Sequence, residues 1–218
     1  MLAESPPNIS HRNDLQLPLR KAGSLDDVHL WQNVKRDNEL AFSVLYKKYT
    51  QRLYNYGIHS CQDHDLVMDC LQELFVSIWD KRKNLTTVHS VSSYLFKSFR
   101  HLLMKKLSWR RRFLHTIDAN QEKYFEIILP AEALIEKGED QEEQSEKMRR
   151  CLVTLTKRQR EAIFLRFYND LSYSDIASIM ELQVDSVYNI ISKAIDSLRQ
   201  KLKAFGVAGL SAILFILQ

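Results

Sequence analysis

Helix-breaking residues are nearly missing from most of this chain, and that feature constrains the fold more than any other. Three of the four prolines fall within the first 18 residues, and from residue 25 onward only Pro130 interrupts helix formation. Proline removes a helical hydrogen bond, and glycine, of which there are only five, weakens a helix through its entropy. A hydrophobic fraction of 45% suffices for a folded core. The sequence therefore predicts an all-α protein.

Residues 171–202 have the pattern of a short helix, a tight turn and a longer helix. We expect Ser172 to cap the first helix, with the Asp175 carboxylate reaching back to the Ser172 amide. The turn is expected over residues 181–184 and the second helix from Asp185 or Ser186. Apolar residues recur through the second helix at a helical period, at positions 187, 190, 191, 194, 195, 198 and 202. This is the helix-turn-helix arrangement, although an ordinary helical hairpin fits the spacing equally well.

The opposite face of the second helix is polar and could read bases in a major groove. Asparagine can pair bidentately with adenine, and lysine with guanine or phosphate. Just upstream, Thr156 is expected to cap a helix through a capping box with Gln159. Arg158 and Arg160 lie in that helix and are candidates for phosphate contacts, which fix register. The candidate base contacts are Ser186, Tyr188, Asn189, Ser192 and Lys193.

Residues 25–112 read as a first helical domain, separate from a second one at 148–203. We expect Ser24 or Asp26 to cap its first helix and Asp37 its second. The third should run from about residue 65 to 79 and the fourth from Ser92 or Ser93. From residue 97 to 115 the fourth helix and its extension carry seven Lys or Arg and no Asp or Glu. Such one-sided charge favours a polyanion surface over a merely solvated face.

The two predicted domains are joined by an acidic linker at 113–147. From residue 116 to 147 there are ten acidic residues against three lysines. Residues 1–24 are predicted to be a disordered arm, and residues 204–218 an apolar tail. The apolar run of that tail is shorter than the ~20 residues that span a bilayer. Three cysteines form no closed set of pairs, and no secretion signal precedes the first domain, so we expect a cytoplasmic protein.

Together these features resemble the extracytoplasmic-function (ECF) class of bacterial sigma factors, across residues 25–203. Residues 69–79, DCLQELFVSIW, are similar to the family's D-x-V-Q-E-x-F-x-x-x-W segment. Residues 155–161, LTKRQRE, and 171–177, LSYSDIA, are similar to its L-P-x-x-x-R-E and L-S-Y-x-E-I-A. The apolar tail resembles that of the iron-citrate-regulator-like group. His101 stands where the family usually has Asn, Glu181 replaces the usual turn Gly, and Asp185 adds a negative charge near the DNA end.

The resemblance implies a protein that binds core RNA polymerase and promoter DNA and is held by an anti-sigma factor. The first domain would be sigma region 2 and the second sigma region 4, which reads the minus-thirty-five element. The implied polymerase contacts are Asp69, Gln72, Glu73, Phe75 and Trp79. The implied contacts near the minus-ten element are Lys97, Arg100, His101, Lys105 and Lys106, with Asn84, Thr86, Thr87 and His89 of the 83–90 loop holding an unstacked base.

No P-loop, nucleophile motif or metal-ligand spacing occurs in the sequence. We therefore expect no enzyme activity, no cofactor, no metal and no small-molecule substrate. One alternative is a free-standing helix-turn-helix regulator that binds an operator without polymerase. A nucleic-acid enzyme or a pure interaction protein is a further alternative, which activity on DNA without polymerase would support.

Overall fold

The computed structural model describes residues 24–114, 125–127 and 149–204, and the regular secondary structure of these residues is entirely helical. No strand occurs among those residues, so the predicted fold class is confirmed. The arm, most of the linker and the apolar tail lie outside the described residues. The helices are α1 (Ser24–Lys35), α2 (Glu39–Cys61), α3 (His64–Asp80), α4 (Val91–Leu114), α6 (Lys157–Ile163), α7 (Tyr173–Met180) and α8 (Val184–Ala204), with a short 3-10 turn η1 (Arg82–Asn84) and a π turn η4 (Phe164–Tyr168).

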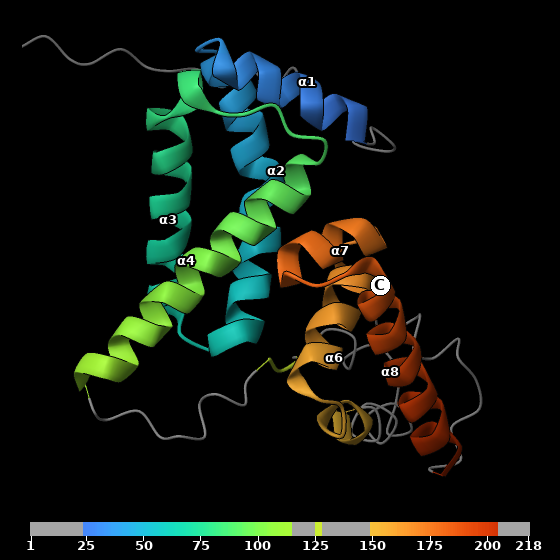
Figure 1. Cartoon of the computed structure of the whole chain (residues 1–218). Helices are drawn as coiled ribbons and strands as arrows, with labels where there is room; N and C mark the ends of the chain where they lie inside the picture. Colours follow the sequence, from blue (N-terminus) through green and yellow to red (C-terminus); the bar gives the residue numbers. More distant parts are fainter. Residues whose placement is uncertain (1–23, 115–124, 128–148, 205–218) are drawn as a thin grey trace, which may run out of the picture.

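The first domain is a four-helix arrangement in which α2 and α3 run side by side. In Figure 1, α4 crosses both obliquely and α1 lies across the end of the bundle. The inward faces follow the predicted helical periods, and Tyr49, Leu53 and Tyr56 of α2 are almost fully buried. They meet Leu95, Phe96, Phe99 and Leu103 of α4. Burying these large side chains is the main favourable term for this domain.

Three helix starts differ from prediction by one or two residues. The α2 helix is capped by Asn38, whose side chain accepts from the Ala41 amide, while Asp37 adopts a left-handed φ of 65°. The α3 helix is capped by Asp63. The Ser90 hydroxyl accepts from the Ser93 amide at 3.1 Å, so α4 begins earlier than expected. Several adjacent polar residues could cap each start, and the hydrophobic period alone does not choose among them.

Gly57 marks the closest approach of the helices in this domain. A Cβ atom there would lie 2.8 Å from both Val67 methyl carbons and 3.1 Å from Cζ of Phe99. Alanine favours helix by about 1 kcal/mol over glycine, but overpacking a core costs about 1–3 kcal/mol. We expect Gly57→Ala to lower the free energy of unfolding by about 1 kcal/mol, measured by urea denaturation. Val67→Ala should relieve the clash, so the two substitutions should couple favourably, and a stabilised Gly57→Ala protein would contradict this packing.

The second domain packs the short helices α6 and α7 against the long helix α8 (Figure 1). Val187, Ile191, Ala194 and Leu198 form the fully buried stripe of α8, as its period predicts. The α7 helix ends at Met180 and is capped by Glu181, which adopts a left-handed φ of 57°. Glu181 thus occupies the conformation that glycine usually supplies, and its amide donates to the Ala177 carbonyl. The turn is one residue shorter than predicted, because α8 begins at Val184.

The capping predictions in this domain are confirmed in one case and partly wrong in the other. Thr156 and Gln159 form the complete capping box at the start of α6. Ser172 caps α7 by accepting from the Asp175 amide at 3.1 Å. However, the Asp175 carboxylate accepts from the Ser172 hydroxyl at 2.7 Å and not from its amide. The hydroxyl serves both partners at once.

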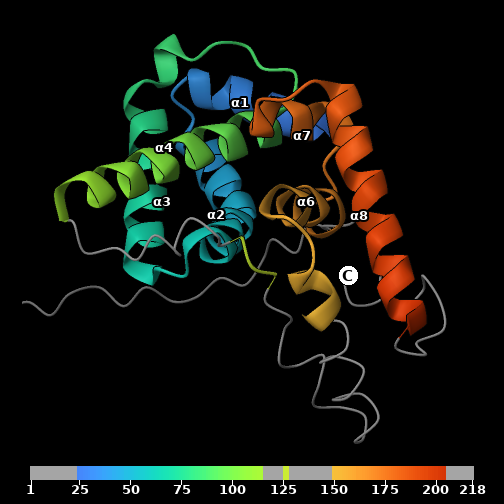
Figure 2. The same cartoon turned by 60° about the horizontal axis from the view of Figure 1, so that its bottom comes forward.

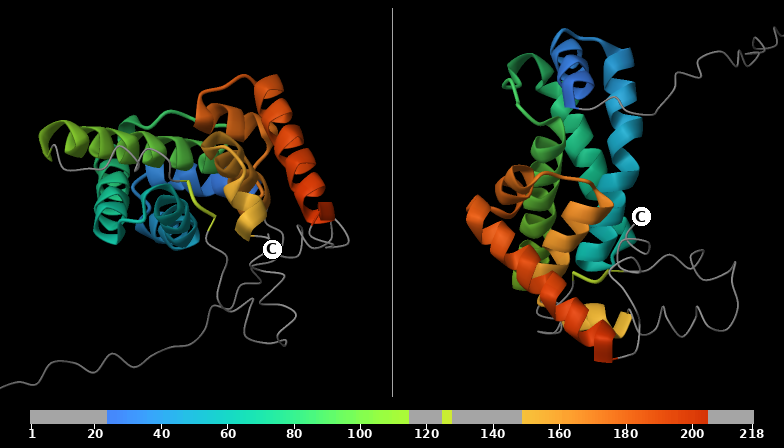
Figure 3. Two further views of the ribbon diagram at one scale, coloured as in Figure 1. Left: turned by 90° about the horizontal axis from the view of Figure 1, so that it is seen from below. Right: turned by 90° about the vertical axis from the view of Figure 1, so that its right-hand side faces the viewer.

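The two domains are docked against each other, which sequence periodicity did not indicate. Figures 2 and 3 show α7 lying against one end of α4. Residues 125–127 run extended between the domains, and the Glu126 amide donates to the carbonyl of His59 at 2.8 Å. Phe125 and Ile127 are buried. The buried residues of both domains therefore form one continuous cluster.

His59 lies in this junction, with its ring 4.5 Å from that of Phe164. Burial lowers the pKa of His59 from its ordinary 6.5 to about 4, against the opposing influence of Glu126. The unfolded chain therefore binds the extra proton first as the pH falls. We expect this group to contribute about 3 kcal/mol of stability above pH 6.5, lost as the pH falls from about 6.5 toward 4.

The acid sensitivity can be measured by urea denaturation at several pH values. His59→Gln should flatten the dependence relative to the wild type between pH 7 and 5, because the variant has no imidazole to protonate. Equal pH dependence of the two proteins would contradict the assignment.

Candidate nucleic-acid interface

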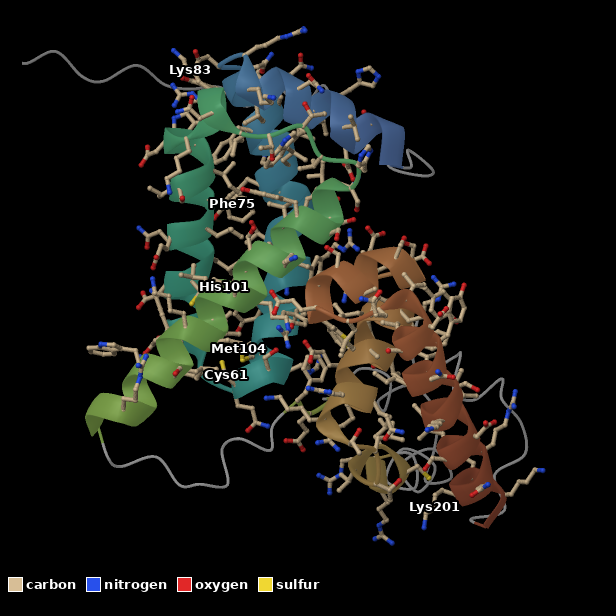
Figure 4. All side chains as sticks on the ribbon, in the orientation of Figure 1. Cys61, Phe75, Lys83, His101, Met104 and Lys201 are labelled. Carbon is tan, nitrogen blue, oxygen red and sulfur yellow. The ribbon has the colours of Figure 1, made fainter. Side chains whose placement is uncertain are left out.

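The outer face of α8 presents the predicted base-reading residues to solvent. Tyr188, Asn189, Ser192 and Lys193 are exposed, and Ser186 is half-buried. These residues lie in the N-terminal half of α8. They are on the face opposite the buried stripe, which packs the helix against α6 and α7. In Figure 4 the opposite end of this helix, marked by Lys201, lies far from the first domain. The helix is thus rigidly held while its polar face stays free.

Tyr188 is not a mobile side chain, because its ring stacks on Tyr173 at 3.9 Å with an interplanar angle of 13°. The Arg166 guanidinium lies 5.2 Å from the centre of the Tyr173 ring. Arg166 also donates to the Leu171 carbonyl at 2.8 Å, which fixes it in turn. This three-layer stack ties the first residues of α7 to the exposed face of α8. The sequence analysis did not predict a role for Tyr173 and Arg166. Their stack with Tyr188 joins α7 to α8, and the relative orientation of these helices is visible only in the structure.

The two arginines predicted to hold phosphates from α6 differ in their surroundings. Arg158 is exposed and available to a phosphate. Arg160 instead donates to the backbone carbonyls of Phe125 and Leu155, and at 3.3 Å to that of Val153. Its guanidinium therefore ties the linker segment to the second domain. The predicted phosphate role of Arg160 does not fit this conformation, because its donors already face protein acceptors.

The basic residues of α4 are split between a free stripe and internal ion pairs. Lys97, His101 and Lys105 are exposed at intervals of four residues, and therefore share one side of the helix. Lys106 pairs with Glu73 of α3 at 2.8 Å. Arg100 pairs with Glu161 of the second domain at 2.8 Å, so in this conformation it faces protein. The candidate phosphate-binding face of α4 therefore has fewer exposed cations than the count of basic residues predicted.

A groove of about 540 Å³ runs beside this stripe between α3 and α4. Lys97, His101 and Lys105 lie on its rim, and Leu74, Ile78 and Leu102 form apolar parts of its wall. Glu181 from the end of α7 also lines it. In Figure 4, His101 faces outward from the middle of α4. The groove combines cationic and apolar walls, which suits a nucleic-acid strand with a base turned inward.

The loop between η1 and α4 carries the predicted polar side chains on its surface. Asn84, Thr86, Thr87 and His89 are all exposed. The loop is anchored by Trp31 of α1, whose indole nitrogen donates to the Thr86 carbonyl at 3.1 Å. Arg82 and Lys83 both pair with Asp37 at the start of α2, with the Lys83 contact at 3.0 Å. Backbone anchoring of this kind leaves the side chains free to meet a ligand.

A second exposed surface lies on α3 and is acidic and polar. Asp69, Gln72 and Glu73 are exposed and lie within one turn of each other. Val76 continues the same face and is 52% exposed, although it is a large apolar residue. Exposed apolar groups rimmed by polar ones are typical of protein contacts. Helical spacing from residue 69 could have identified Val76, which the motif-based prediction omitted.

Phe75 and Trp79 were predicted to belong to the same polymerase-binding surface. In the structure both side chains instead pack against α2, behind the exposed face of α3. Phe75 is 4% exposed, and its ring packs edge-on against that of Tyr46 at 4.8 Å. Figure 4 shows Phe75 on the side of α3 that faces the bundle. Trp79 is half-buried between Phe42, at 4.9 Å, and the Arg82 guanidinium, at 4.2 Å. Direct contact by Phe75 does not fit this geometry, because the ring is enclosed by α2.

Within the described residues, no group of three His, Cys, Asp or Glu side chains is arranged to hold a metal ion. In the same part of the chain, no helix is both long and apolar enough to cross a membrane. The exposed side chains of these surfaces include cations, amides, hydroxyls and carboxylates, which bind ligands through charge and hydrogen bonds.

Both domains match known protein families. Residues 45–113 match sigma-70 region 2, and residues 145–198 match sigma-70 region 4. The ECF RNA polymerase sigma factor SigX of Bacillus subtilis is 25% identical over 170 residues, covering 76% of this chain and 85% of SigX. The RNA polymerase sigma-H factor of Pseudomonas aeruginosa is 24% identical over 186 residues, covering 81% of this chain and 94% of that protein.

Solved structures share the fold. The chain matches CnrH, solved in complex with the cytosolic domain of CnrY, with a TM-score of 0.55 and 18% identity, over 82% of this chain and 98% of that one. It matches RpoE of Bartonella quintana, solved with the anti-sigma factor NepR, with a TM-score of 0.53 and 21% identity, over 74% and 96% respectively. The chain belongs to the sigma-70 family, with the two-region organisation of ECF sigma factors.

Proposed function

We propose that this sigma factor binds core RNA polymerase through α3 and directs it to promoters by gripping DNA at two points. The observation that carries the proposal is the presence of region 2 and region 4 on one chain, each with its own exposed candidate DNA face. A single operator-binding domain would need only the second of these. Transcription initiation is the activity that uses both.

Region 4 would read the upstream, minus-thirty-five element. The N-terminal half of α8 would enter the major groove, with Asn189 and Lys193 reaching base edges. Arg158 at the start of α6 would hold a phosphate and set the register. The Tyr173–Tyr188 stack would fix the rotation of α8 in the groove. Support comes from the exposure of these side chains on a helix whose other face is fully packed.

Region 2 would act near the minus-ten element. The stripe of Lys97, His101 and Lys105 would follow the phosphate backbone, with affinity falling as salt rises. The anchored loop, with Thr86 and His89 exposed, would hold a base that has left the stack. Support comes from the groove beside the stripe and from the fixed loop backbone.

Several further roles follow from membership of the family. The chain would act in the cytoplasm, where core polymerase is found, and would direct chemistry without performing any. An anti-sigma factor would restrain it, since CnrH and RpoE were each solved with such a partner or a partner's cytosolic domain. The acidic linker would follow a polymerase channel shaped for RNA. The resemblance to the iron-citrate-regulator-like group rests on the tail at 204–218, outside the described residues.

In vitro transcription with purified core polymerase tests this function. We expect defined transcripts only when the protein is added to core enzyme on genomic templates, with start sites preceded by two shared sequence elements. Tight binding to duplex DNA by the isolated chain, without any transcript in the presence of core enzyme, would favour the free-standing regulator instead.

A further inference from the structure

An exposed aromatic ring lies among the polar side chains of α8 and is held in one orientation. Tyr188 is 51% exposed, although its ring stacks on that of Tyr173 with centres 3.9 Å apart and an interplanar angle of 13°. Stacking covers one face only, so the exposed area belongs to the outer face and the edges of the ring. A free surface tyrosine samples several rotamers, but a stacked ring is confined to one of them. Tyr188 therefore presents a fixed apolar surface to solvent.

The Tyr173 ring is itself held by an arginine. The Arg166 guanidinium lies 5.2 Å from the centre of that ring, within the range of a cation–π contact. Arg166 also donates to the carbonyl of Leu171 at 2.8 Å and lies 3.9 Å from a carboxylate oxygen of Asp170. The three stacked groups come from η4, α7 and α8. The orientation of the Tyr188 ring is therefore set by the tertiary structure of this domain.

Tyr188 lies at the edge of the face that would read bases. Val184 precedes it by one helical turn and Ser192 follows it by one turn, and both are exposed. Asn189, the next residue along the helix, is exposed as well. Figure 2 shows α7 beside the first turns of α8, where these residues lie. Asn189 and Ser192 offer polar groups, whereas Val184 and Tyr188 form an apolar strip along one side of α8.

The major groove of DNA offers a matching apolar group. Thymine carries a methyl group at C5 that projects into this groove, and the other three bases lack it. Bases in a duplex remain stacked, so a ring that approaches from the groove meets their edges and not their faces. An apolar side chain that contacts a thymine methyl removes apolar surface of both groups from water. A ring that is already immobilised loses little conformational entropy on contact, which favours binding further.

We propose that Tyr188 recognises a thymine of the upstream promoter element through the C5 methyl group of that base. The contact rests on the proposed function, in which the N-terminal half of α8 enters the major groove and brings the ring to the base edges. Tyr188 contacts the base, and Tyr173 and Arg166 are positioning residues that act through its ring. The thymine lies close to the base read by Asn189, because the two side chains are consecutive on the helix.

The test removes one methyl group at a time from the DNA. The full chain with purified core polymerase, below saturation, transcribes a promoter whose start site has been mapped. Each thymine of the upstream element, on either strand, is replaced in turn by deoxyuridine, which pairs as thymine does and lacks only the methyl group. At one position we expect the wild type to make about fourfold less transcript, the size expected for burial of one methyl group.

Variants of the stack separate the ring from its hydroxyl and from its supports. Tyr188→Ala should lose the deoxyuridine penalty, so that both templates give equal transcript, whereas Tyr188→Phe should keep the penalty. Tyr173→Leu should reduce the penalty to about twofold or less, because Tyr188 is no longer held by a stacked ring, and Tyr173→Phe should restore it. Arg199→Ala, near the other end of α8, should match the wild type on both templates. Circular dichroism checks that each variant retains its helical content.

An equal deoxyuridine penalty in the wild type and in Tyr188→Ala would overturn the thymine contact, and so would a wild type that transcribes every substituted template equally. If Tyr188→Phe and Tyr188→Ala lower transcription alike from all templates, the hydroxyl contacts a phosphate and the ring reads no base. Should Tyr188→Ala lose helical content, the comparison of Tyr173→Leu with Tyr173→Phe decides. In these cases transcription still depends on the protein, so the proposed function stands. If no transcript depends on the protein, the proposed function and the thymine contact both fail.

Discussion

A variant carrying Gln72→Ala and Glu73→Ala should bind core RNA polymerase about 30-fold more weakly than the wild type, a loss of about 2 kcal/mol. Both side chains are exposed on α3 beside Asp69 and Val76, so their removal takes away contacts with a partner and leaves the core intact. Helical content and the urea midpoint should remain close to those of the wild type. The dissociation constant can be measured with labelled protein and purified core enzyme.

One internal contact must be separated from this effect. Glu73 pairs with Lys106, so truncating it also releases a lysine on α4. Lys106→Met breaks the same ion pair without altering the α3 face, and should leave polymerase affinity within twofold of the wild type, as expected for a partly exposed pair. Undiminished core binding by the double variant would remove α3 from the polymerase interface. An equal loss in Lys106→Met would assign the effect to the ion pair.

The second large effect is expected on promoter choice. Asn189→Ala or Lys193→Ala should each weaken use of the best upstream element by about 1–3 kcal/mol and reduce discrimination at one base position. The two side chains lie on the exposed face of α8, away from the stripe of Val187 and Ile191 that holds the helix. Transcription from templates with single-base changes in the upstream element measures the loss.

A matched control for these variants is Arg199→Ala, which removes an exposed cation near the other end of α8. It should weaken transcription little and leave the order of preferred sequences unchanged. If Asn189→Ala ranks upstream variants as the wild type does, that residue does not read a base. Lys193→Ala with a uniform loss on every template would show a phosphate contact in place of a guanine contact.

Local sequence patterns predicted the helices well because burial follows helical period directly. The Thr156–Gln159 capping box and the buried stripe of α8 needed only neighbours three or four residues apart. Glu181 could be recognised as the turn residue although it is not glycine. Such contacts join residues that are close together in the sequence, so they can be predicted from one sequence alone.

Long-range contacts explain what the sequence did not predict. Arg100 and Glu161 are 61 positions apart, and no periodicity links them. Arg160 was predicted to contact phosphate, yet its guanidinium donates to the carbonyl of Phe125 in the linker and to those of Leu155 and Val153. Phe75 was assigned to the polymerase surface from a motif alone, although the helical period of α3 places it on the inward face, where it is 4% exposed. The roles of side chains that connect the two domains can be recognised only when the packing of one domain on the other is known.

The most direct test of the two-point grip is a hydroxyl-radical footprint of the protein with core polymerase on a mapped promoter. Two protected patches are expected, about two helical turns apart, and Asn189→Ala should lose the upstream patch while the downstream one remains. A single patch, or the same protection by the isolated chain without polymerase, would contradict the account.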